Sequence, residues 1–160
     1  MENNIYSRTE SLIGKDSLNI LKNSKVIVFG IGGVGSFTVE SLCRCGIGEI
    51  SLVDFDTIDI TNINRQIHAM SNNIGKYKVD EMKKRIELIN PDIKVNTFTK
   101  KLDKNNVENF NLKYYDYVVD AIDIITSKIY LIKCCYENNI NIISAMGAGN
   151  KLDPTRFKVV

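Results

Sequence analysis

Four glycines near the start of the chain are arranged as in a phosphate-binding turn. The segment GIGGVG at residues 30–35 matches the pattern GxGxxG and directly follows the β-branched run KVIVF. Where such a turn joins a strand to a helix, backbone N–H groups and the helix dipole converge on a bound phosphate. A tight turn without a ligand is the alternative. The acidic residue that follows the next predicted strand favours nucleotide binding over that alternative.

Carboxylates after the second predicted strand are placed to bind a ribose. Asp54 ends the run EISLVD, and a carboxylate at this point can accept hydrogen bonds from both ribose hydroxyls. Asp56 follows two residues later and fits either this role or that of capping a loop. On these residues alone, NAD and ATP fit equally well.

Basic residues further along the chain favour ATP. Arg65, in the segment NINRQ, and Lys78 could together neutralise a triphosphate, which nicotinamide cofactors lack. Lys76 and Lys78 also fall in the first turn of a predicted helix, where the dipole disfavours cations unless an anion lies nearby. A bound phosphate would supply that anion. The alternative is that both lysines are solvated surface residues.

Two more aspartates follow the fourth predicted strand. Asp120 and Asp123 lie where ligands bind in open α/β sheets, and either could hold Mg²⁺ or contact a substrate. Asp123 is the better placed, since Asp120 fits a helix cap or a strand-end hydrogen bond equally well. His68 is the only histidine, and no nucleophile motif surrounds it, so we predict a structural role.

The cysteines indicate packing rather than catalysis or metal binding. They form neither a CxxC knuckle nor the framework of a secreted disulfide protein, so we expect reduced thiols. Cys45 falls on a predicted buried stripe with Val34, Thr38 and Leu42, and Cys135 falls on another with Ile129 and Ile132. Cys43 and Cys134 are predicted on other helix faces.

The order of these elements indicates an α/β fold. Strands are predicted at 25–30, 49–54, 93–98, 115–122 and 141–145, with helical patterns between them, including one at 76–89. Such alternation requires parallel pairing through right-handed crossovers, which predicts a Rossmann-like, doubly wound, mainly parallel sheet with helices on both faces. The polar stretch 55–75 is long for a connection and is predicted to be a site loop.

Length and composition are those of a globular domain. The chain has 160 residues, 44% of them hydrophobic, and a formal net charge of +2, which does not by itself indicate a nucleic-acid-binding protein. We divide it into an N-terminal helical segment, 1–24, and a nucleotide-binding domain, 25–160. Without a bilayer-long apolar run or a signal peptide, it is expected to be cytoplasmic, with no membrane segment. The last ten residues resemble the start of an uncovered strand, which suggests C-terminal truncation.

Several motifs together resemble one family of enzymes. GIGGVGS, the DFD after the second strand, NINRQIHA, GKYK and VVDAID are similar in type and order to those of the ThiF/MoeB/HesA superfamily of ubiquitin-activating-like adenylating enzymes. The resemblance covers nearly the whole chain. With ESLCRCGIG, RIELINPD and the late GAGNKLDPT, the fuller pattern is most similar to the tRNA threonylcarbamoyladenosine dehydratase branch.

This resemblance implies an activity and a set of site residues. ATP and Mg²⁺ would activate the carboxylate of threonylcarbamoyladenosine beside the tRNA anticodon, and the carbamoyl group of the same side chain would close a ring with loss of water. Arg65, Lys78 and Asp123 are the implied catalytic residues, of which Asp123 contacts Mg²⁺ or the transferring phosphate. Gly32, Gly33 and Gly35 would hold phosphates, Asp54 the ribose, and Asn62, Arg65 and Lys78 the triphosphate. Gly30, Asp56 and Asp123 complete the implied ATP-binding set.

The resemblance also implies partners and leaves alternatives open. Members are homodimers in which an N-terminal arginine enters the neighbouring site, and Arg8 matches that residue, although an exposed tail arginine is the alternative. A second function is activation of the C-terminus of a ubiquitin-like sulfur carrier, of the thiamine or molybdopterin type, with a sulfur-transfer partner protein. A third is an NAD-binding module, which leaves Arg65 and Lys78 without a role. Relatives continue beyond Val160 into further strands and, in many, a catalytic cysteine.

Overall fold

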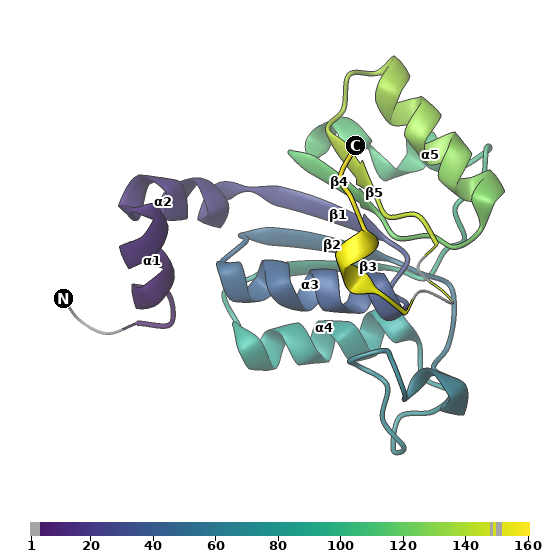
Figure 1. Ribbon diagram of the computed structural model, residues 1–160, viewed down its shortest axis with the longest axis horizontal. Helices are drawn as coiled ribbons and strands as arrows, with labels where there is room; N and C mark the ends of the chain where they lie inside the picture. Colours follow the sequence, from purple (N-terminus) through teal and green to yellow (C-terminus); the bar gives the residue numbers. More distant parts are fainter. Residues whose placement is uncertain (1–3, 148, 150–151) are drawn as a thin grey trace.

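A five-stranded parallel sheet is the framework of the molecule (Figure 1). The computed structural model describes residues 4–147, 149 and 152–160. Within them the strand order is β3-β2-β1-β4-β5, and every neighbouring pair is parallel. This confirms the predicted Rossmann-like architecture. The strands are β1 (Lys25–Phe29), β2 (Glu49–Val53), β3 (Lys94–Phe98), β4 (Tyr117–Asp120) and β5 (Ile142–Ser144).

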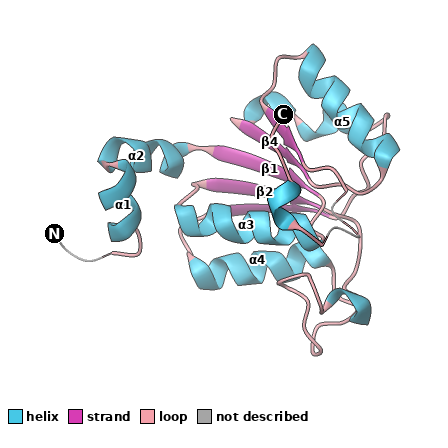
Figure 2. Ribbon diagram, in the orientation of Figure 1, coloured by secondary structure: helices cyan, strands magenta, loops and turns pink. Residues whose placement is uncertain are grey.

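Helices cover both faces of the sheet (Figure 2). One face carries α3 (Gly33–Cys45) and α4 (Lys78–Ile89), and the other carries α5 (Ile125–Glu137). Helices α1 (Ser7–Ile13) and α2 (Lys15–Asn23) lie beside the end of the sheet at which β1 begins. Single turns of 3-10 helix are η1 (Ile60–Asn62), η2 (Val107–Phe110), η3 (Leu112–Tyr114) and η4 (Pro154–Arg156).

The central strand β1 contributes alternate side chains to two separate cores. Val26 and Val28 pack with Val39 of α3 and with Met82 of α4. Ile27 and Phe29 point to the opposite face, where they join residues of η2, η3 and α5. Because β1 is buried on both sides, its sequence is a continuous apolar run rather than an alternating one.

Two predicted helix faces are wrong in part. In α3, Val34 and Cys45 are exposed, and the buried side is formed by Gly35, Val39 and Cys43. The apolar pattern misled because small or polar residues, Gly35 among them, occupy this buried side. In α5, likewise, Ile129 is exposed while Lys128 is buried.

The prediction of a further strand at the end of the chain is also wrong for the residues described there. Residues 154–156 form η4, which begins at a proline and is capped by the side chain of Asp153. Ala148, Asn150 and Lys151, which belong to the late GAGNKLDPT motif, lie outside the described residues.

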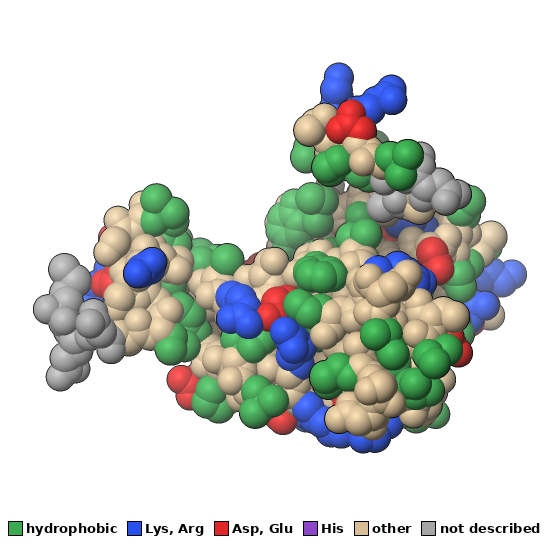
Figure 3. All heavy atoms as spheres, turned by 60° about the horizontal axis from the view of Figure 1, so that its bottom comes forward, with side chains coloured by type: hydrophobic (Ala, Val, Ile, Leu, Met, Phe, Trp, Pro, Cys, Tyr) green, Lys and Arg blue, Asp and Glu red, His purple; other side chains and the backbone are tan. Residues whose placement is uncertain are grey.

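The surface does not carry charge of one sign only. On the face viewed in Figure 3, basic and acidic side chains lie among patches of hydrophobic ones. In the described part of the chain, no helix is both long enough and apolar enough to span a bilayer.

Candidate functional site

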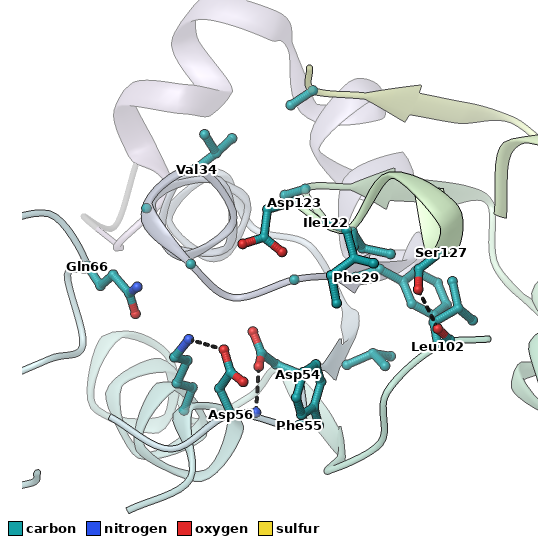
Figure 4. Close-up of a pocket in the computed structure, with 18 of the residues that line it drawn as sticks. Phe29, Val34, Asp54, Phe55, Asp56, Gln66, Leu102, Ile122, Asp123 and Ser127 are labelled. Carbon is teal, nitrogen blue, oxygen red and sulfur yellow. Dashed lines mark hydrogen bonds and ion pairs between the residues drawn. The ribbon is translucent and has the colours of Figure 1, made fainter. Parts of the chain in front are cut away.

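A cavity of about 780 Å³ opens at the carboxyl ends of the strands. In this sheet order the connections after β1 and β4 leave toward opposite sides, and ligands bind in the crevice that such a switch creates. In Figure 4 the carboxylates of Asp54, Asp56 and Asp123 surround the glycine-rich turn in this cavity. The wall also includes Gly30, Gly32, Gly33, Val34, Asn62, Arg65, Gln66, Lys78, Lys100, Lys101, Ser127 and Met146.

The glycines of the turn fall into two groups. Gly30 has a φ of 85°, and a Cβ there would lie 2.6 Å from the carbonyl oxygen of Ala121; a Cβ on Gly35 would lie 1.8 Å from the carbonyl oxygen of Gly30. These two glycines therefore allow backbones to pack. Gly35 is buried and lies outside the cavity wall, where it packs beneath the turn. Gly32 and Gly33 line the cavity with room beside them.

The first turn of α3 faces this cavity without a side-chain cap. The helix begins at Gly33, and its N-cap residue is Gly32. Glycine has no side chain, so the cap residue accepts no hydrogen bond from the first N–H groups of the helix. Uncapped N–H groups together with the helix dipole favour an anion at this point. The geometry is therefore suited to phosphate.

Asp54 is held rigidly at the end of β2. Its Oδ2 accepts a hydrogen bond from the N–H of Ile31 at 2.7 Å, and its Oδ1 accepts one from the N–H of Asp56 at 2.9 Å. Burial raises the pKa of Asp54, and the two N–H groups and nearby Lys78 act in the opposite direction. Each carboxylate oxygen retains a further lone pair for a ligand hydroxyl.

Lys78 is buried, so it is not a solvated surface lysine. Only 6% of the residue is exposed, and its Nζ lies 2.7 Å from Oδ2 of Asp56. The backbone N–H of Lys78 also donates to the carbonyl of Asp56. The anion near the start of α4 is thus a carboxylate of the chain itself. Lys76, in contrast, is exposed and precedes the helix.

The segment after β2 folds on itself and brings two more predicted residues to the cavity. Asn62 is buried, and its Oδ1 accepts a hydrogen bond from the N–H of Asp59 in a capping box that starts η1. The N–H of Arg65 donates to the carbonyl of Asn62. The stem of Arg65 lies over Gly33, since a Cβ on that glycine would be 3.5 Å from Cγ of Arg65. Arg65 is exposed, and Nη1 of its guanidinium donates hydrogen bonds to the carbonyl oxygen of Thr61 at 2.8 Å and to Oδ1 of Asn64 at 3.0 Å.

The sequence analysis missed four polar residues in the cavity wall, one of which is Ser127, whose hydroxyl donates to the carbonyl oxygen of Leu102. Gln66 is 5% exposed and lies near Gly32, and its Oε1 has no hydrogen-bond partner among the described protein atoms. It could have been nominated as the neighbour of Arg65. Lys100 and Lys101 follow β3 at the same edge of the sheet and are exposed. Their position after a parallel strand was the available signal.

Asp123 and Asp120, the two aspartates at the end of β4 and just after it, lie in different environments. Asp123 is exposed and points into the cavity. Asp120 is fully buried and forms an ion pair of 2.7 Å with Lys128, outside the cavity wall. Asp120 was expected either to cap a helix or to form hydrogen bonds at the end of a strand, and the structure favours the second role.

Arg8 lies far from the cavity of its own chain. It is exposed on α1, which is anchored at the opposite end of the sheet by the buried Tyr6. The hydroxyl of Tyr6 is hydrogen-bonded to the side chain of Asn90, and its ring packs on Gly46. Arg8 is therefore part of an ordered helix rather than of a disordered tail.

The cysteines lie as packing predicts, with one correction. Cys43, not Cys45, is buried in the core against α4, and burial raises its pKa to about 12. Cys135 is buried as predicted. All four cysteines are free thiols.

Comparison with known proteins identifies the family. The pattern of the ThiF family matches residues 6–158. The chain belongs to the ThiF family. Among curated ThiF relatives, the tRNA threonylcarbamoyladenosine dehydratase of Bacillus subtilis is 51% identical over 154 residues, which are 96% of this chain and 61% of that protein. The adenylyltransferase and sulfurtransferase UBA4 of Vanderwaltozyma polyspora is 37% identical over 82% of this chain and 30% of its own.

A solved ThiF-family structure has the same fold with a nucleotide bound. The structure of E. coli tRNA N6-threonylcarbamoyladenosine dehydratase, TcdA, in complex with ATP matches with a TM-score of 0.92 and 41% identity. The match covers 94% of this chain and 62% of the E. coli chain. This ThiF-family chain therefore spans about three fifths of the length of the dehydratases that it resembles.

His68 has the structural role predicted for it in this ThiF-family chain. The side chain is 1% exposed, and neither ring nitrogen has a hydrogen-bond partner among the described protein atoms. Burial, with the nearby cations Lys78 and Arg85, lowers the pKa of His68 to about 4. The folded chain thus holds a neutral imidazole that the unfolded chain protonates below pH about 6.5.

This difference predicts a pH dependence of stability. As pH falls from about 6.5 to 4, the unfolded state binds a proton that the folded state does not, so the free energy of unfolding decreases by up to about 3 kcal/mol. Urea unfolding between pH 4.5 and 7 should show this slope in the wild type and a much flatter one in His68→Leu. Because the chain has one histidine, equal slopes in the two proteins would contradict this account.

Proposed function

We propose that this chain is the nucleotide-binding and adenylating part of an ATP-dependent tRNA-modifying enzyme. Its substrate is the carboxylate of threonylcarbamoyladenosine next to the anticodon, and its product is the cyclised, dehydrated side chain. The proposal is supported by 51% identity to a curated dehydratase and by the ATP complex of the E. coli enzyme. Since the chain spans only part of those proteins, the activity is proposed for the complete protein.

One observation carries the choice of ATP. The uncapped start of α3 at Gly32 and Gly33 meets Arg65 in the same cavity, with Lys78 also in its wall. Helix dipole and cations together suit a polyphosphate with several negative charges. Asp54 lies at the end of the neighbouring strand, where it can accept hydrogen bonds from ribose hydroxyls. An NAD-binding module would leave this concentration of cations unexplained.

The proposed reaction has two steps. A carboxylate oxygen of the substrate attacks the α-phosphorus of ATP, and the bond to pyrophosphate breaks. A nitrogen or oxygen atom of the carbamoyl moiety then attacks the activated carbonyl carbon. The bond to AMP breaks as the ring closes, and the carbamoyl moiety releases one N–H proton to water. Arg65 and Lys78 stabilise the charge on departing pyrophosphate, and the turn at Gly32 and Gly33 holds the phosphates in position.

The residues present fit a Mg²⁺ ion that is bound largely by the nucleotide. Asp123 is an exposed carboxylate in the cavity and has no ion-pair partner among the described residues. No cluster of three acidic, histidine or cysteine side chains that could hold a metal occurs in the described part of the chain. Mg²⁺ commonly binds one or two carboxylates together with substrate phosphates. In that arrangement Asp123 holds the ion, which supplies charge neutralisation at the phosphates.

We further propose a homodimer in which Arg8 of one protomer completes the site of the other. This is supported by its position on α1, at the end of the sheet opposite the cavity, which excludes a role in the site of its own chain.

Gly30, Asp56 and Asn62 complete the proposed nucleotide-binding set, with Gly35 supporting the turn from below.

Nucleotide binding provides the first test. Mg-ATP at 100 times its dissociation constant should raise the free energy of unfolding by about 2.7 kcal/mol, and NADH should not. Arg65→Ala and Lys78→Ala should each reduce the stabilisation by ATP, because each removes a cation from the phosphate side. Lys76→Ala is the matched control, since this exposed lysine lies two residues away and outside the cavity wall. Stabilisation by NADH alone would favour the dinucleotide-binding module.

The substrate is tested by pyrophosphate exchange with the full-length protein. Labelled pyrophosphate should enter ATP when tRNA carrying threonylcarbamoyladenosine is added, because adenylation of its carboxylate is reversible. The same tRNA without the modification is the control and should give no exchange. If exchange instead requires a ubiquitin-like protein ending in two glycines, the substrate is a sulfur-carrier protein and not tRNA. That outcome would agree with the similarity to UBA4.

A further inference from the structure

A buried ion pair lies directly behind the cavity wall. Lys128, in the first turn of α5, is 7% exposed, and Asp120, the last residue of β4, is fully buried. Nζ of Lys128 donates to Oδ2 of Asp120 at 2.7 Å, to the carbonyl oxygen of Ala145 at 3.0 Å and to Oγ of Ser144 at 3.3 Å. All three hydrogens of the ammonium group are thus used.

The pair connects two segments that line the cavity. Oδ1 of Asp120 accepts a hydrogen bond from the N–H of Ile122 at 3.0 Å, immediately before Asp123. Oδ2 of Asp120 accepts a second hydrogen bond, from Oγ of Ser144 at 2.6 Å, at the end of β5. Asp123 and Met146 belong to the cavity wall, whereas Lys128 and Asp120 do not. The pair therefore acts on a ligand only through these segments.

Its burial sets this pair apart from the other ion pairs of the described residues. The side chains of Lys128 and Asp120 are 9% and 0% exposed, whereas in each of the other pairs one side chain is exposed by 33% or more. A buried pair contributes little net stability, because desolvation offsets the attraction, but breaking it leaves an uncompensated charge. Fixing one local geometry is the better-supported use of such a pair.

We propose that Lys128 and Asp120 are positioning residues for the adenylation site. Together they fix Asp123 and the segment after β5 relative to the phosphate-binding turn. The inference deepens the proposed function and rests on it, since it assigns a role in holding the nucleotide and the activated carboxylate. Misplacing such groups by about 1 Å can lower a rate by roughly 100-fold.

The test compares three variants of the full-length protein. Lys128→Met keeps the length of the side chain and removes the charge and the three donors. The double variant Lys128→Met with Asp120→Asn leaves no unpaired charge and retains an acceptor for the N–H of Ile122. Arg85→Met is the matched control, because Arg85 pairs with the largely buried Glu40 between α3 and α4, away from the cavity wall. Urea stability, affinity for a non-hydrolysable ATP analogue and pyrophosphate exchange are measured for each.

A positioning role predicts that stability and activity separate. Lys128→Met should lose both stability and exchange, whereas the double variant should recover most of the stability while its exchange kcat stays roughly 10-fold or more below wild type. Arg85→Met should lose stability and keep exchange within about twofold of wild type. Exchange at the wild-type rate in the double variant, or an equal loss in Arg85→Met, would overturn the proposal.

Failure of the proposed function would be recognised separately. If the wild-type protein bound the ATP analogue but gave no exchange, adenylation of the tRNA would be refuted. The affinity for the analogue would then decide the positioning role alone. A loss of about fivefold or more in the double variant, with Arg85→Met unchanged, would support it, and unchanged affinity in the double variant would overturn it.

Discussion

The contact between the turn after β1 and the segment after β4 is the constraint on which the site depends. Gly30 passes so close to Ala121 that a Cβ on it would lie 2.6 Å from that carbonyl oxygen, and Gly35 rests on Gly30 in turn. This close packing brings the start of α3 to the carboxyl edge of the sheet, next to the segment that carries Asp123. The dipole of α3 and a carboxylate suited to Mg²⁺ thus face one cavity.

The charges of this cavity come from a few self-supporting segments. Asp54, Asp56 and Lys78 form one chain of contacts, in which the N–H of Asp56 donates to Asp54 and the carboxylate of Asp56 pairs with Lys78. Arg65 is placed by the capped turn η1. On the other side, the buried pair behind Asp123 joins β4, α5 and β5. Preorganised groups of this kind need little rearrangement when a charged ligand binds.

Much of this arrangement could be predicted from the sequence because it follows from local rules. Strand, glycine turn and helix predict the phosphate-binding turn, and the end of a parallel strand predicts the location of Asp54 and Asp123. Helix faces were harder: in α3 and α5 the buried side includes Gly35 and Lys128, which apolar periodicity counts as outward-facing. The partners of Lys128 and the burial of Lys78 depend on contacts between distant segments, which spacing along the chain does not encode.

The central claim, that the cavity supports transfer of AMP to a carboxylate, is tested most directly by following oxygen. Threonylcarbamoyladenosine in tRNA is prepared with ¹⁸O in its carboxylate and incubated with ATP and the full-length protein, and the nucleotide products are analysed by mass spectrometry. In the proposed reaction a carboxylate oxygen bonds to the α-phosphorus and stays there when the ring closes, so AMP should carry one ¹⁸O atom. Label in inorganic phosphate together with ADP, or AMP without label, would contradict the account.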